Sequence, residues 1–411
     1  MKYGLIGERL GHSFSKEIHE KIANYTYEIC PLAKNELDDF FKNPDFCGIN
    51  VTIPYKESVI PYLDSISEHA KKIGAVNTIK NENGKLNGYN TDYEGMCALI
   101  RHSKIKVEGK KALILGTGGT SKTAKAVLFD LGASEITVVG RSENADISYD
   151  EMYKNYTDAQ IIINTTPVGM FPKNEDTIVD VSKFPNLTGV IDAIYNPLRS
   201  NLVLNAKKRG IKAQGGLYML VSQAIFASQI FLGKDFDESE CERIYKKILT
   251  EKENIVLIGM PSSGKTTTAM YLANETGREV IDTDDEIVKK IGMPISDYFA
   301  QYGEEKFREV ESEVIREVSA KNGVIIATGG GAILKEENVL SLKQNGRLFF
   351  LNRSIEFLTP TSDRPTASDY EALRNLYFKR YEIYKSVADE VIPSNGTIPQ
   401  IAEIIKGEFF K

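Results

Sequence analysis

Two glycine-rich turns in this sequence carry the residue types that hold phosphate groups. One occupies positions 116–119, after the apolar segment 111–115, and the other occupies positions 259–266, after the apolar segment 255–258. A strand that ends in such a turn and continues into a helix points backbone N–H groups at an anion. Two units of this kind in one chain predict two nucleotide sites of different type.

The second turn fits the complete G-x-x-x-x-G-K-[ST] pattern of a P-loop. In that pattern the backbone cradles the phosphates, the lysine reaches the β and γ oxygens, and the next hydroxyl ligates Mg²⁺. The strand IVLI before it and the helical segment TTTAMYLANE after it supply the context that the motif requires. We therefore predict a site for a nucleoside triphosphate and Mg²⁺ formed by Gly259, Gly264, Lys265, Thr266 and Thr267.

The first turn is a weaker dinucleotide signal, because Ser121 stands where the G-x-G-x-x-G pattern has its third glycine, and a plain strand-to-helix turn is the alternative. The end of the next strand sharpens the interpretation. Enzymes that use NAD usually have an acidic residue there, whereas this chain has Arg141 and Ser142. A guanidinium and a hydroxyl suit a 2′-phosphate, which favours NADP over NAD. The alternative for Arg141 is a solvated loop arginine.

Carboxylates and arginines after the P-loop indicate an anionic acceptor. Asp282 and Asp284 follow a short strand, so one can support the metal and the other can orient a hydroxyl nucleophile, although a helix N-cap is the alternative. A second glycine turn, 329–331, follows the strand VIIAT. Three arginines suit a migrating phosphoryl group, although a surface salt bridge is the alternative for each one. They are Arg308, Arg364 and Arg380.

Small polar residues punctuate the first hundred positions, together with Lys56 and Asp92. Singly they are ordinary helix caps, turn formers or solvated charges. Together they offer a polyhydroxy acid many hydrogen-bonding partners, and a lysine–aspartate pair can relay the proton that reduction of a ketone requires. The polar residues are Ser13, Ser15, Asn50, Thr52 and Asn77.

At this point a resemblance becomes specific. The segments GHSFS, NVTIPYK, GAVNT, NTDYEG, GTGGTSK, INTTPVGM, DAIYNP and GGLYMLVSQA resemble, in order, the shikimate dehydrogenase family over about residues 1–250. The resemblance implies that Lys56 and Asp92 are the catalytic pair. It implies substrate contacts by Ser13, Ser15, Thr52, Asn77, Asp92 and Gln223, and cofactor contacts by Gly116, Gly118, Gly119, Arg141 and Ser142. Lys16 and Gly140 depart from the family pattern, where proline and asparagine are usual.

The rest of the chain, about residues 253–411, resembles shikimate kinase through GMPSSGKTTT, DTDDEI, GEEKFREVE, ATGGGA, DRP and KRYEIY. This resemblance implies that Asp284 faces the hydroxyl to be phosphorylated, that Asp282 serves the metal through water, and that Arg364 belongs to a mobile lid. Shikimate would be bound by Asp284, Arg308, Gly330 and Arg380. The stretch Thr359-Pro360-Thr361 departs from the family, which usually has a further arginine there.

The elements that position these residues alternate between strand and helix, which predicts an α/β fold. We expect a substrate domain at 1–100, a Rossmann domain at 101–216 and a P-loop kinase domain with a parallel sheet at 253–411. Two helices at 217–250, separated at Gly233, would return to the substrate domain. Any linker is expected to be a few residues near 250–254.

Length and composition fit this organisation. A chain of 411 residues exceeds what one hydrophobic core supports. The net charge of −6, with no basic block, argues against a nucleic-acid partner. Four cysteines without metal spacing, no signal-like start and no long apolar run predict a cytoplasmic protein without a membrane partner. The oligomeric state is left open.

The sequence thus predicts a bifunctional enzyme of aromatic amino acid biosynthesis. Its first half would reduce 3-dehydroshikimate with NADPH, and its second half would phosphorylate shikimate with ATP and Mg²⁺. Three alternatives stay open. They are a quinate/shikimate dehydrogenase half that uses NAD, a shikimate-sensing regulator without catalysis, and another small-molecule P-loop kinase such as a gluconate or nucleoside kinase.

Overall fold

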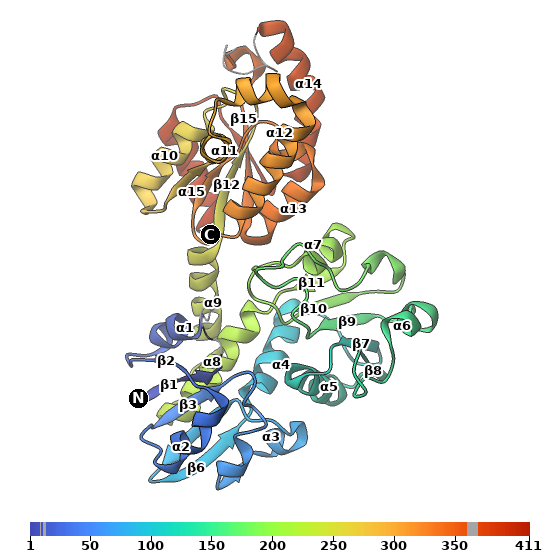
Figure 1. The fold of residues 1–411 in the computed structure, drawn as a ribbon, viewed down its shortest axis with the longest axis vertical. Coiled ribbons are helices and arrows are strands. Elements are labelled where there is room, and N and C mark those ends of the chain that lie inside the picture. The colour runs from blue at the N-terminus through green and yellow to red at the C-terminus, as the bar shows by residue number, and fades with distance from the viewer. Residues whose placement is uncertain (9, 11–13, 360–368) are drawn as a thin grey trace. The chain divides into compact units, whose positions relative to one another are not determined.

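The computed structural model describes residues 1–8, 10, 14–359 and 369–411. The chain forms two compact units, Met1–Ile248 and Leu249–Lys411 (Figure 1). The boundary between them falls inside a single helix, α9 (Glu238–Lys252). Any linker is expected from the sequence to be a few residues near 250–254; the helix continues through Lys252 and the next strand starts at Asn254, so a single residue, Glu253, separates the two elements.

The N-terminal part of the first unit is built on a six-stranded mixed sheet. Its strand order is β2-β1-β3-β5-β6-β4, and only β5 runs antiparallel to both of its neighbours. The strands are β1 (Tyr3–Gly7), β2 (Glu28–Pro31), β3 (Gly48–Val51), β4 (Ser65–Ile66), β5 (Thr78–Glu82) and β6 (Lys85–Tyr89). The helices are α1 (Ser15–Ile22), α2 (Leu37–Lys42) and α3 (Glu68–Ile73), with 3-10 turns at Lys34–Glu36 and Ile60–Tyr62.

A second sheet follows, in which all five strands are parallel, in the order β11-β10-β9-β7-β8. Parallel neighbours require crossovers; α-helices lie in three of the four successive connections here, and the one from β9 to β10 contains only a 3-10 turn. The strands are β7 (Lys111–Leu115), β8 (Glu135–Val139), β9 (Ile161–Asn164), β10 (Gly189–Asp192) and β11 (Lys212–Gln214). The helices are α5 (Gly119–Asp130), α6 (Tyr149–Asn155) and α7 (Asn201–Lys208), with a 3-10 turn at Val181–Lys183.

Two helices tie the sheets of the first unit together. Helix α4 (Thr91–Ser103) leads from the first sheet to the second, and α8 (Leu217–Leu232) returns and packs along α4 and against α1 (Figure 1). Helix α8 ends at Gly233, whose φ of 61° places it in the left-handed region that favours glycine. On the sheet, a Cβ at Gly48 would stand 2.3 Å from the ring of Phe231, so α8 lies directly on β3.

The second unit is a parallel five-stranded sheet covered by helices on both faces. Its strand order is β13-β14-β12-β15-β16. The strands are β12 (Asn254–Ile258), β13 (Val280–Asp282), β14 (Ile325–Ala327), β15 (Gly346–Asn352) and β16 (Glu390–Pro393). The helices are α10 (Lys265–Thr276), α11 (Thr283–Ile291), α12 (Ile295–Ser319), α13 (Glu336–Asn345), α14 (Tyr370–Val387) and α15 (Ile398–Phe409), with 3-10 turns at Ala332–Leu334 and Ile355–Phe357.

The central strand β12 shows why this sheet is buried on both sides. Ile255 and Leu257 belong to one apolar core, and Val256 and Ile258 belong to the core on the opposite face. All four side chains are fully buried. An unbroken apolar strand is what a parallel sheet between two helical layers requires. The expected fold class, an α/β fold with a Rossmann part and a P-loop part, is confirmed.

Candidate active sites

Lys56 and Asp92 form an ion pair in the first unit. Lys56 follows β3, Asp92 lies in the first turn of α4, and the lysine Nζ is 2.5 Å from the aspartate Oδ2. The two side chains are largely buried, with 18 % and 12 % of their surface exposed. The Cδ of Lys56 also lies 4.0 Å from the position that a Cβ on Gly119 would take. The pair therefore adjoins the glycine-rich turn, where a proton donor would have to stand beside a dinucleotide.

Asn77 holds the turn of helix that carries Asp92. Its Oδ1 accepts a hydrogen bond of 2.7 Å from the backbone N–H of Thr91. Its backbone carbonyl accepts one of 3.2 Å from Nδ2 of Asn50, whose Oδ1 in turn accepts from the hydroxyl of Tyr27. Only 3 % of Asn77 is exposed. Through the bond to Thr91, Asn77 holds the first turn of α4, and with it Asp92, in place.

The other residues expected to touch the substrate come from separate elements. Ser15 begins α1 and is buried. Thr52 follows β3, and its Cγ2 lies 2.6 Å from the Cβ position of Gly7 at the end of β1. Gln223 of α8 packs against α4, with its Cβ 3.0 Å from the Cβ position of Gly95. Ser13 lies outside the described residues.

Tyr195, which the sequence analysis did not single out within DAIYNP, reaches the same region. Its ring lies 5.3 Å from that of Phe14, the residue just before α1. Burial raises the pKa of its hydroxyl, which favours the neutral form of this side chain. The signal that could have found it is an aromatic residue that follows the carboxyl end of a parallel strand, β10.

In the glycine-rich turn after β7, neighbouring side chains leave no room for a Cβ at Gly116. Gly116 has a φ of 106°, and a Cβ there would stand 2.9 Å from both Thr165 Oγ1 and Thr166 Cγ2. By contrast, a Cβ at Gly118 would meet no atom within 4 Å, so the outer side of the turn is open to a ligand. Ser121, in place of the third glycine, is buried in α5. These residues fit a bound pyrophosphate at the N-terminus of α5.

Arg141 and Ser142 line a hollow of about 770 Å³ beside this turn. The hydroxyl of Ser142 is 2.9 Å from that of Thr117 in the turn itself, and the Arg141 guanidinium lies over the ring of Tyr149 at 6.0 Å. Both residues are exposed at the end of β8. A Cβ at Gly140 would stand 2.8 Å from Thr117, which explains glycine at this departure from the family pattern. The hollow suits the 2′-phosphate end of NADP.

The P-loop joins β12 to α10 in the second unit. Gly264 caps α10 with a φ of 91°, and the Lys265 Nζ donates hydrogen bonds of 2.9 Å to the carbonyls of Gly259 and Met260. The Thr266 hydroxyl donates to Oδ2 of Asp282 at 2.7 Å. Thr267 is exposed in the first turn of α10. The lysine and the threonine thus lie where a P-loop needs them, and the P-loop contacts the acid at the end of β13.

Asp282 has two roles that the sequence analysis had treated as alternatives. Its Oδ1 accepts a hydrogen bond of 3.0 Å from the backbone N–H of Asp284, so it caps α11. Its other oxygen holds Thr266, the expected Mg²⁺ ligand. The Thr266 hydroxyl and the Asp282 carboxylate are the oxygen donors that Mg²⁺ prefers, with nucleotide phosphates and water completing its shell. Among the described residues, no group of three or more His, Cys, Asp or Glu could hold a metal ion alone.

The residues expected to bind the acceptor gather around the glycine turn after β14. Asp284 Oδ1 lies 2.5 Å from the Cβ position of Gly329, and Arg308 Nη1 lies 2.0 Å from that of Gly331. Arg380 Nη1 donates a hydrogen bond of 2.8 Å to the carbonyl of Gly330. Pro261 of the P-loop is 3.1 Å from the Cβ position of Gly330, so the acceptor residues and the phosphate loop share one edge of the sheet.

Two buried partners of this cluster were not found from sequence. Glu311 accepts a hydrogen bond of 2.6 Å from Arg308, one turn away on α12, and the Tyr384 hydroxyl donates to the carbonyl of Gly330 at 2.6 Å. Burial raises the pKa of Glu311, and the Arg308 guanidinium opposes that shift. Burial also disfavours the charged form of Arg380, and for a cation this lowers the pKa. The spacing of Arg308 and Glu311 by three residues was the available signal.

Arg353 is a further cation that sequence reasoning missed. It follows β15, beside β12, and its Nη1 lies 3.9 Å from the Cβ position of Gly264 in the P-loop. Its Nε donates to the carbonyl of Phe357 at 3.1 Å. In the described part of the chain (1–8, 10, 14–359 and 369–411) it has no carboxylate partner. Arg364, the expected lid arginine, lies outside the described residues.

Comparison with known proteins covers both units. The family model "Shikimate dehydrogenase substrate binding domain" matches residues 5–79, and the model "Shikimate kinase" matches residues 261–407. A shikimate dehydrogenase (NADP(+)) of Clostridium beijerinckii is 39 % identical over 259 residues, which are 59 % of this chain and 96 % of that protein. Across the described residues, no helix is long and apolar enough to cross a membrane.

Solved structures agree with these matches. Shikimate dehydrogenase 1 from Peptoclostridium difficile is 37 % identical, with a TM-score of 0.56 over 60 % of this chain and 98 % of that one. Shikimate 5-dehydrogenase from Thermus thermophilus, solved with NADP(H) and shikimate, is 27 % identical, with a TM-score of 0.54 over 60 % of this chain and 99 % of that one. The chain therefore belongs to the shikimate dehydrogenase family and joins to it a shikimate kinase domain.

Proposed function

We propose that the chain catalyses two consecutive reactions. Its first unit reduces 3-dehydroshikimate with NADPH to shikimate, and its second unit transfers the terminal phosphoryl group of ATP to the 3-hydroxyl of shikimate. The observation that carries the first activity is the buried pair of Lys56 and Asp92 beside Gly119. The second activity rests on the hydrogen bond between Thr266 and Asp282, which links the P-loop to the acids of the acceptor site.

In the reduction, NADPH supplies the hydride. The ketone oxygen then needs a proton, and the donor is the ammonium of Lys56, whose Cδ lies 4.0 Å from the Cβ position of Gly119 in the glycine-rich turn. Asp92 orients that ammonium through its 2.5 Å contact, and it relays the replacement proton. Asn77 supports this role by holding the first turn of α4 in place.

In the phosphorylation, ATP supplies the phosphoryl group, and the acceptor hydroxyl loses a proton as the new P–O bond forms. Asp284, beside the turn 329–331, is placed to orient that hydroxyl. Arg308 and Arg380 would pair with the carboxylate of shikimate, because a guanidinium binds a carboxylate in a planar, bidentate way. Lys265, and Arg353 next to Gly264, would contact the phosphates of ATP.

One coupled assay tests both activities. Purified protein is mixed with 3-dehydroshikimate, NADPH and Mg-ATP, and NADPH oxidation and ADP formation are followed together. The expected result is that ADP appears only after shikimate has formed, and that omitting NADPH abolishes both signals. Tight binding of shikimate without turnover of either cofactor would instead support a sensing protein. Oxidation of quinate with NAD⁺, without reduction of 3-dehydroshikimate by NADPH, would support the quinate/shikimate alternative.

A further inference from the structure

Thr78 begins β5 and is completely buried, with 0 % of its surface exposed, so no ligand can touch its side chain. Its hydroxyl nevertheless lies at the centre of a group of buried polar side chains. It accepts a hydrogen bond of 2.9 Å from Asn50 Nδ2 and donates one of 3.0 Å to Asn77 Oδ1. The Thr91 hydroxyl is 3.1 Å away. One proton and two lone pairs suffice for these three contacts, so the hydroxyl of Thr78 is fully used within the protein.

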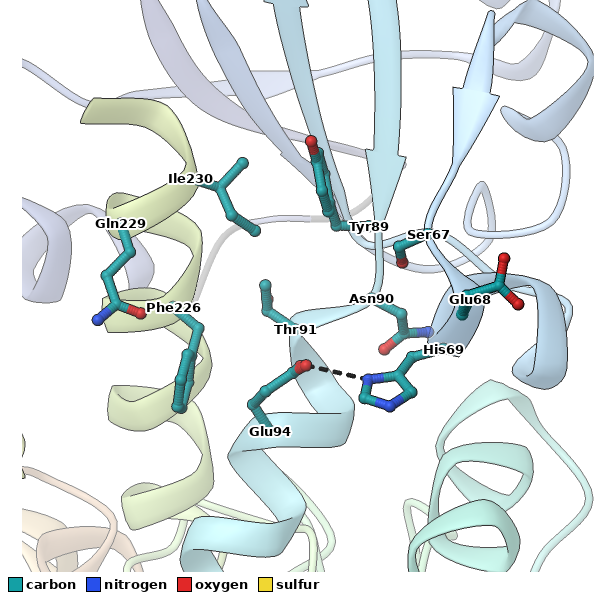
Figure 2. Close-up of a pocket in the computed structure, with 10 residues that line it drawn as sticks. All are labelled: Ser67, Glu68, His69, Tyr89, Asn90, Thr91, Glu94, Phe226, Gln229 and Ile230. Carbon is teal, nitrogen blue, oxygen red and sulfur yellow. Dashed lines mark hydrogen bonds and ion pairs between the residues drawn. The ribbon is translucent and has the colours of Figure 1, made fainter. Parts of the chain in front are cut away.

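The same group reaches the start of α4. Asn90 and Thr91 lie where β6 passes into this helix (Figure 2). Asn90 is the N-cap, but its side chain makes no cap hydrogen bond. Instead, the Thr91 backbone N–H donates to Asn77 Oδ1 at 2.7 Å, and Asn77 Nδ2 donates to the Thr91 hydroxyl at 3.2 Å. Asn77 thus supplies the acceptor that the first N–H groups of a helix need, and Asp92 is the next residue of the turn that it holds.

Tyr27, the residue before β2, closes the far end of the group. Its hydroxyl donates a hydrogen bond of 2.7 Å to Asn50 Oδ1, which leaves Asn50 Nδ2 to donate to Thr78 and to the carbonyl of Asn77. The Tyr27 ring is fully buried and stacks on the ring of His19 at 4.0 Å. Burial raises the pKa of the Tyr27 hydroxyl, which favours the form that donates. A chain of oriented hydrogen bonds therefore runs from a fixed tyrosine to the first turn of α4.

We propose that Thr78 is a positioning residue for the reduction. Together with Asn77, its hydroxyl holds the first turn of α4. This turn keeps the Asp92 carboxylate against the Lys56 ammonium. The inference rests on the proposed function, in which Lys56 gives a proton to the ketone oxygen. Without the hydroxyl, the turn loses its support while the apolar cores stay as they are, so the damage should fall on the proton transfer.

Two substitutions at this position separate the hydroxyl from the rest of the side chain. Thr78→Val removes the hydroxyl and keeps a similar shape, and Thr78→Ser keeps the hydroxyl. We expect Thr78→Val to lower kcat for 3-dehydroshikimate by about 10- to 100-fold, because a displaced catalytic group costs factors of that size, and to leave KM for NADPH unchanged. Thr78→Ser should recover most of kcat. Because the proton transfer becomes the slow step, D₂O should slow Thr78→Val more strongly than the unaltered protein.

Thr137→Val is the matched control, because it removes a buried threonine hydroxyl from a strand of the second sheet, β8. Its kcat should equal that of the unaltered protein. Phosphorylation of added shikimate should be the same in every variant, since Thr78 belongs to the first unit. Hydrogen exchange of the Thr91 backbone N–H, followed on the full chain, adds a measurement that needs no turnover. Exchange should be faster in Thr78→Val than in Thr137→Val.

An unchanged kcat in Thr78→Val, or a loss that Thr78→Ser does not recover, would overturn the proposal. If Thr78→Val does not fold, Tyr27→Phe takes its place, because it removes one oxygen from the same group and keeps the ring that stacks on His19. Its kcat should then fall by about two- to tenfold, the worth of one neutral hydrogen bond, and an unchanged kcat would count against the proposal. If the unaltered protein reduces nothing, the proposed function fails, and exchange at Thr91 alone shows whether Thr78 holds this turn.

Discussion

At the scale of single residues, the proposed proton donor of the first unit is Lys56. We expect Lys56→Ala to slow the turnover of 3-dehydroshikimate by about 10²- to 10⁴-fold, because a positioned proton donor contributes a factor of that size. Phosphorylation of added shikimate should not change, since Lys56 belongs entirely to the first unit. Steady-state assays of both reactions check this. Lys72→Ala, which removes a lysine paired with Asp130 away from the turn, is the control and should leave both rates intact.

We expect Arg141 to decide the preference for NADPH over NADH. Its guanidinium is exposed at the hollow beside the glycine-rich turn, where only NADPH would place a phosphate. Arg141→Ala should lower kcat/KM for NADPH by roughly 10- to 100-fold, the worth of a charge-assisted hydrogen bond, and leave kcat/KM for NADH unchanged. Arg209→Ala, on the exposed end of α7, serves as the comparison. Equal losses with both cofactors would mean that Arg141 supports the fold rather than the 2′-phosphate.

At the scale of elements, the glycine turn after β14 positions Arg308 by leaving room for it. A Cβ at Gly331 would stand 2.0 Å from the guanidinium, so Gly331→Ala must displace the tip of that side chain. The tip is flexible, and the fold should survive. We expect KM for shikimate to rise by about tenfold or more through loss of one charged contact, while KM for ATP stays constant. Gly407→Ala in α15, where a Cβ would meet nothing within 4 Å, is the matched control.

Strand β10 gives the first unit a pH-dependent stability. It ends at Asp192, which accepts hydrogen bonds from Ser200 Oγ, Asn164 Nδ2 and the backbone N–H of Ile194. Burial nevertheless raises the pKa of Asp192 from 3.8 to about 7. The folded state therefore keeps a proton that the unfolded chain has already lost above pH 4. The free energy of unfolding of this unit should fall as pH rises from about 4 to about 7, and then level off.

Asp192→Asn removes this titration and should flatten the pH dependence. Thermal unfolding of the first unit, followed between pH 4 and pH 8, measures it. A gap of about three pKa units corresponds to roughly 4 kcal/mol at most, which amounts to several degrees in the unfolding temperature. Asp150→Asn, an exposed aspartate on α6, should keep the slope of the unaltered protein. Identical slopes in all three proteins would show that Asp192 is already ionised when folded.

What could be predicted at this scale depended on how local the signal was. The strands at 111–115 and 255–258 could be found because apolar runs end in glycine turns. The antiparallel β5–β6 hairpin was missed, although Asn83 and Gly84, with φ values of 55° and 88°, form the kind of turn that Asn-Gly indicates. The turn within α12 at Gly303, with a φ of 81°, was also missed, because one glycine rarely interrupts a helical pattern.

The candidate site residues also fall into those that the sequence could predict and those that it could not. P-loop residues lie next to one another in sequence, so their roles could be predicted from spacing. The contacts between Arg353 and Gly264, or between Asn77 and Thr91, join residues that only the sheet brings together. The resemblance to the two families supplied Lys56 and Asp92 as a pair, but not Glu311, Tyr195 or Tyr384. Buried residues that support a site are hard to read from sequence because their types are those of any core or turn.

At the scale of the whole molecule, each set of reacting residues is contributed by one unit alone. The first unit holds its own apolar cores beneath both of its sheets, and the second holds two more around β12. Although α9 runs across the boundary, the helix supplies none of the residues assigned to either reaction. A fold that encloses each site in its own unit predicts that either activity survives the loss of the other.

This independence predicts complementation between separate molecules. Lys56→Ala should retain only phosphorylation, and Lys265→Ala should retain only reduction. In a mixture of the two variants with 3-dehydroshikimate, NADPH and Mg-ATP, shikimate released by one molecule can reach the kinase site of the other, so ADP should form. Each variant alone should form none from 3-dehydroshikimate. If the mixture forms no ADP from 3-dehydroshikimate although it phosphorylates added shikimate, the shikimate formed by reduction does not leave the molecule that made it. The two sites would then not be independent.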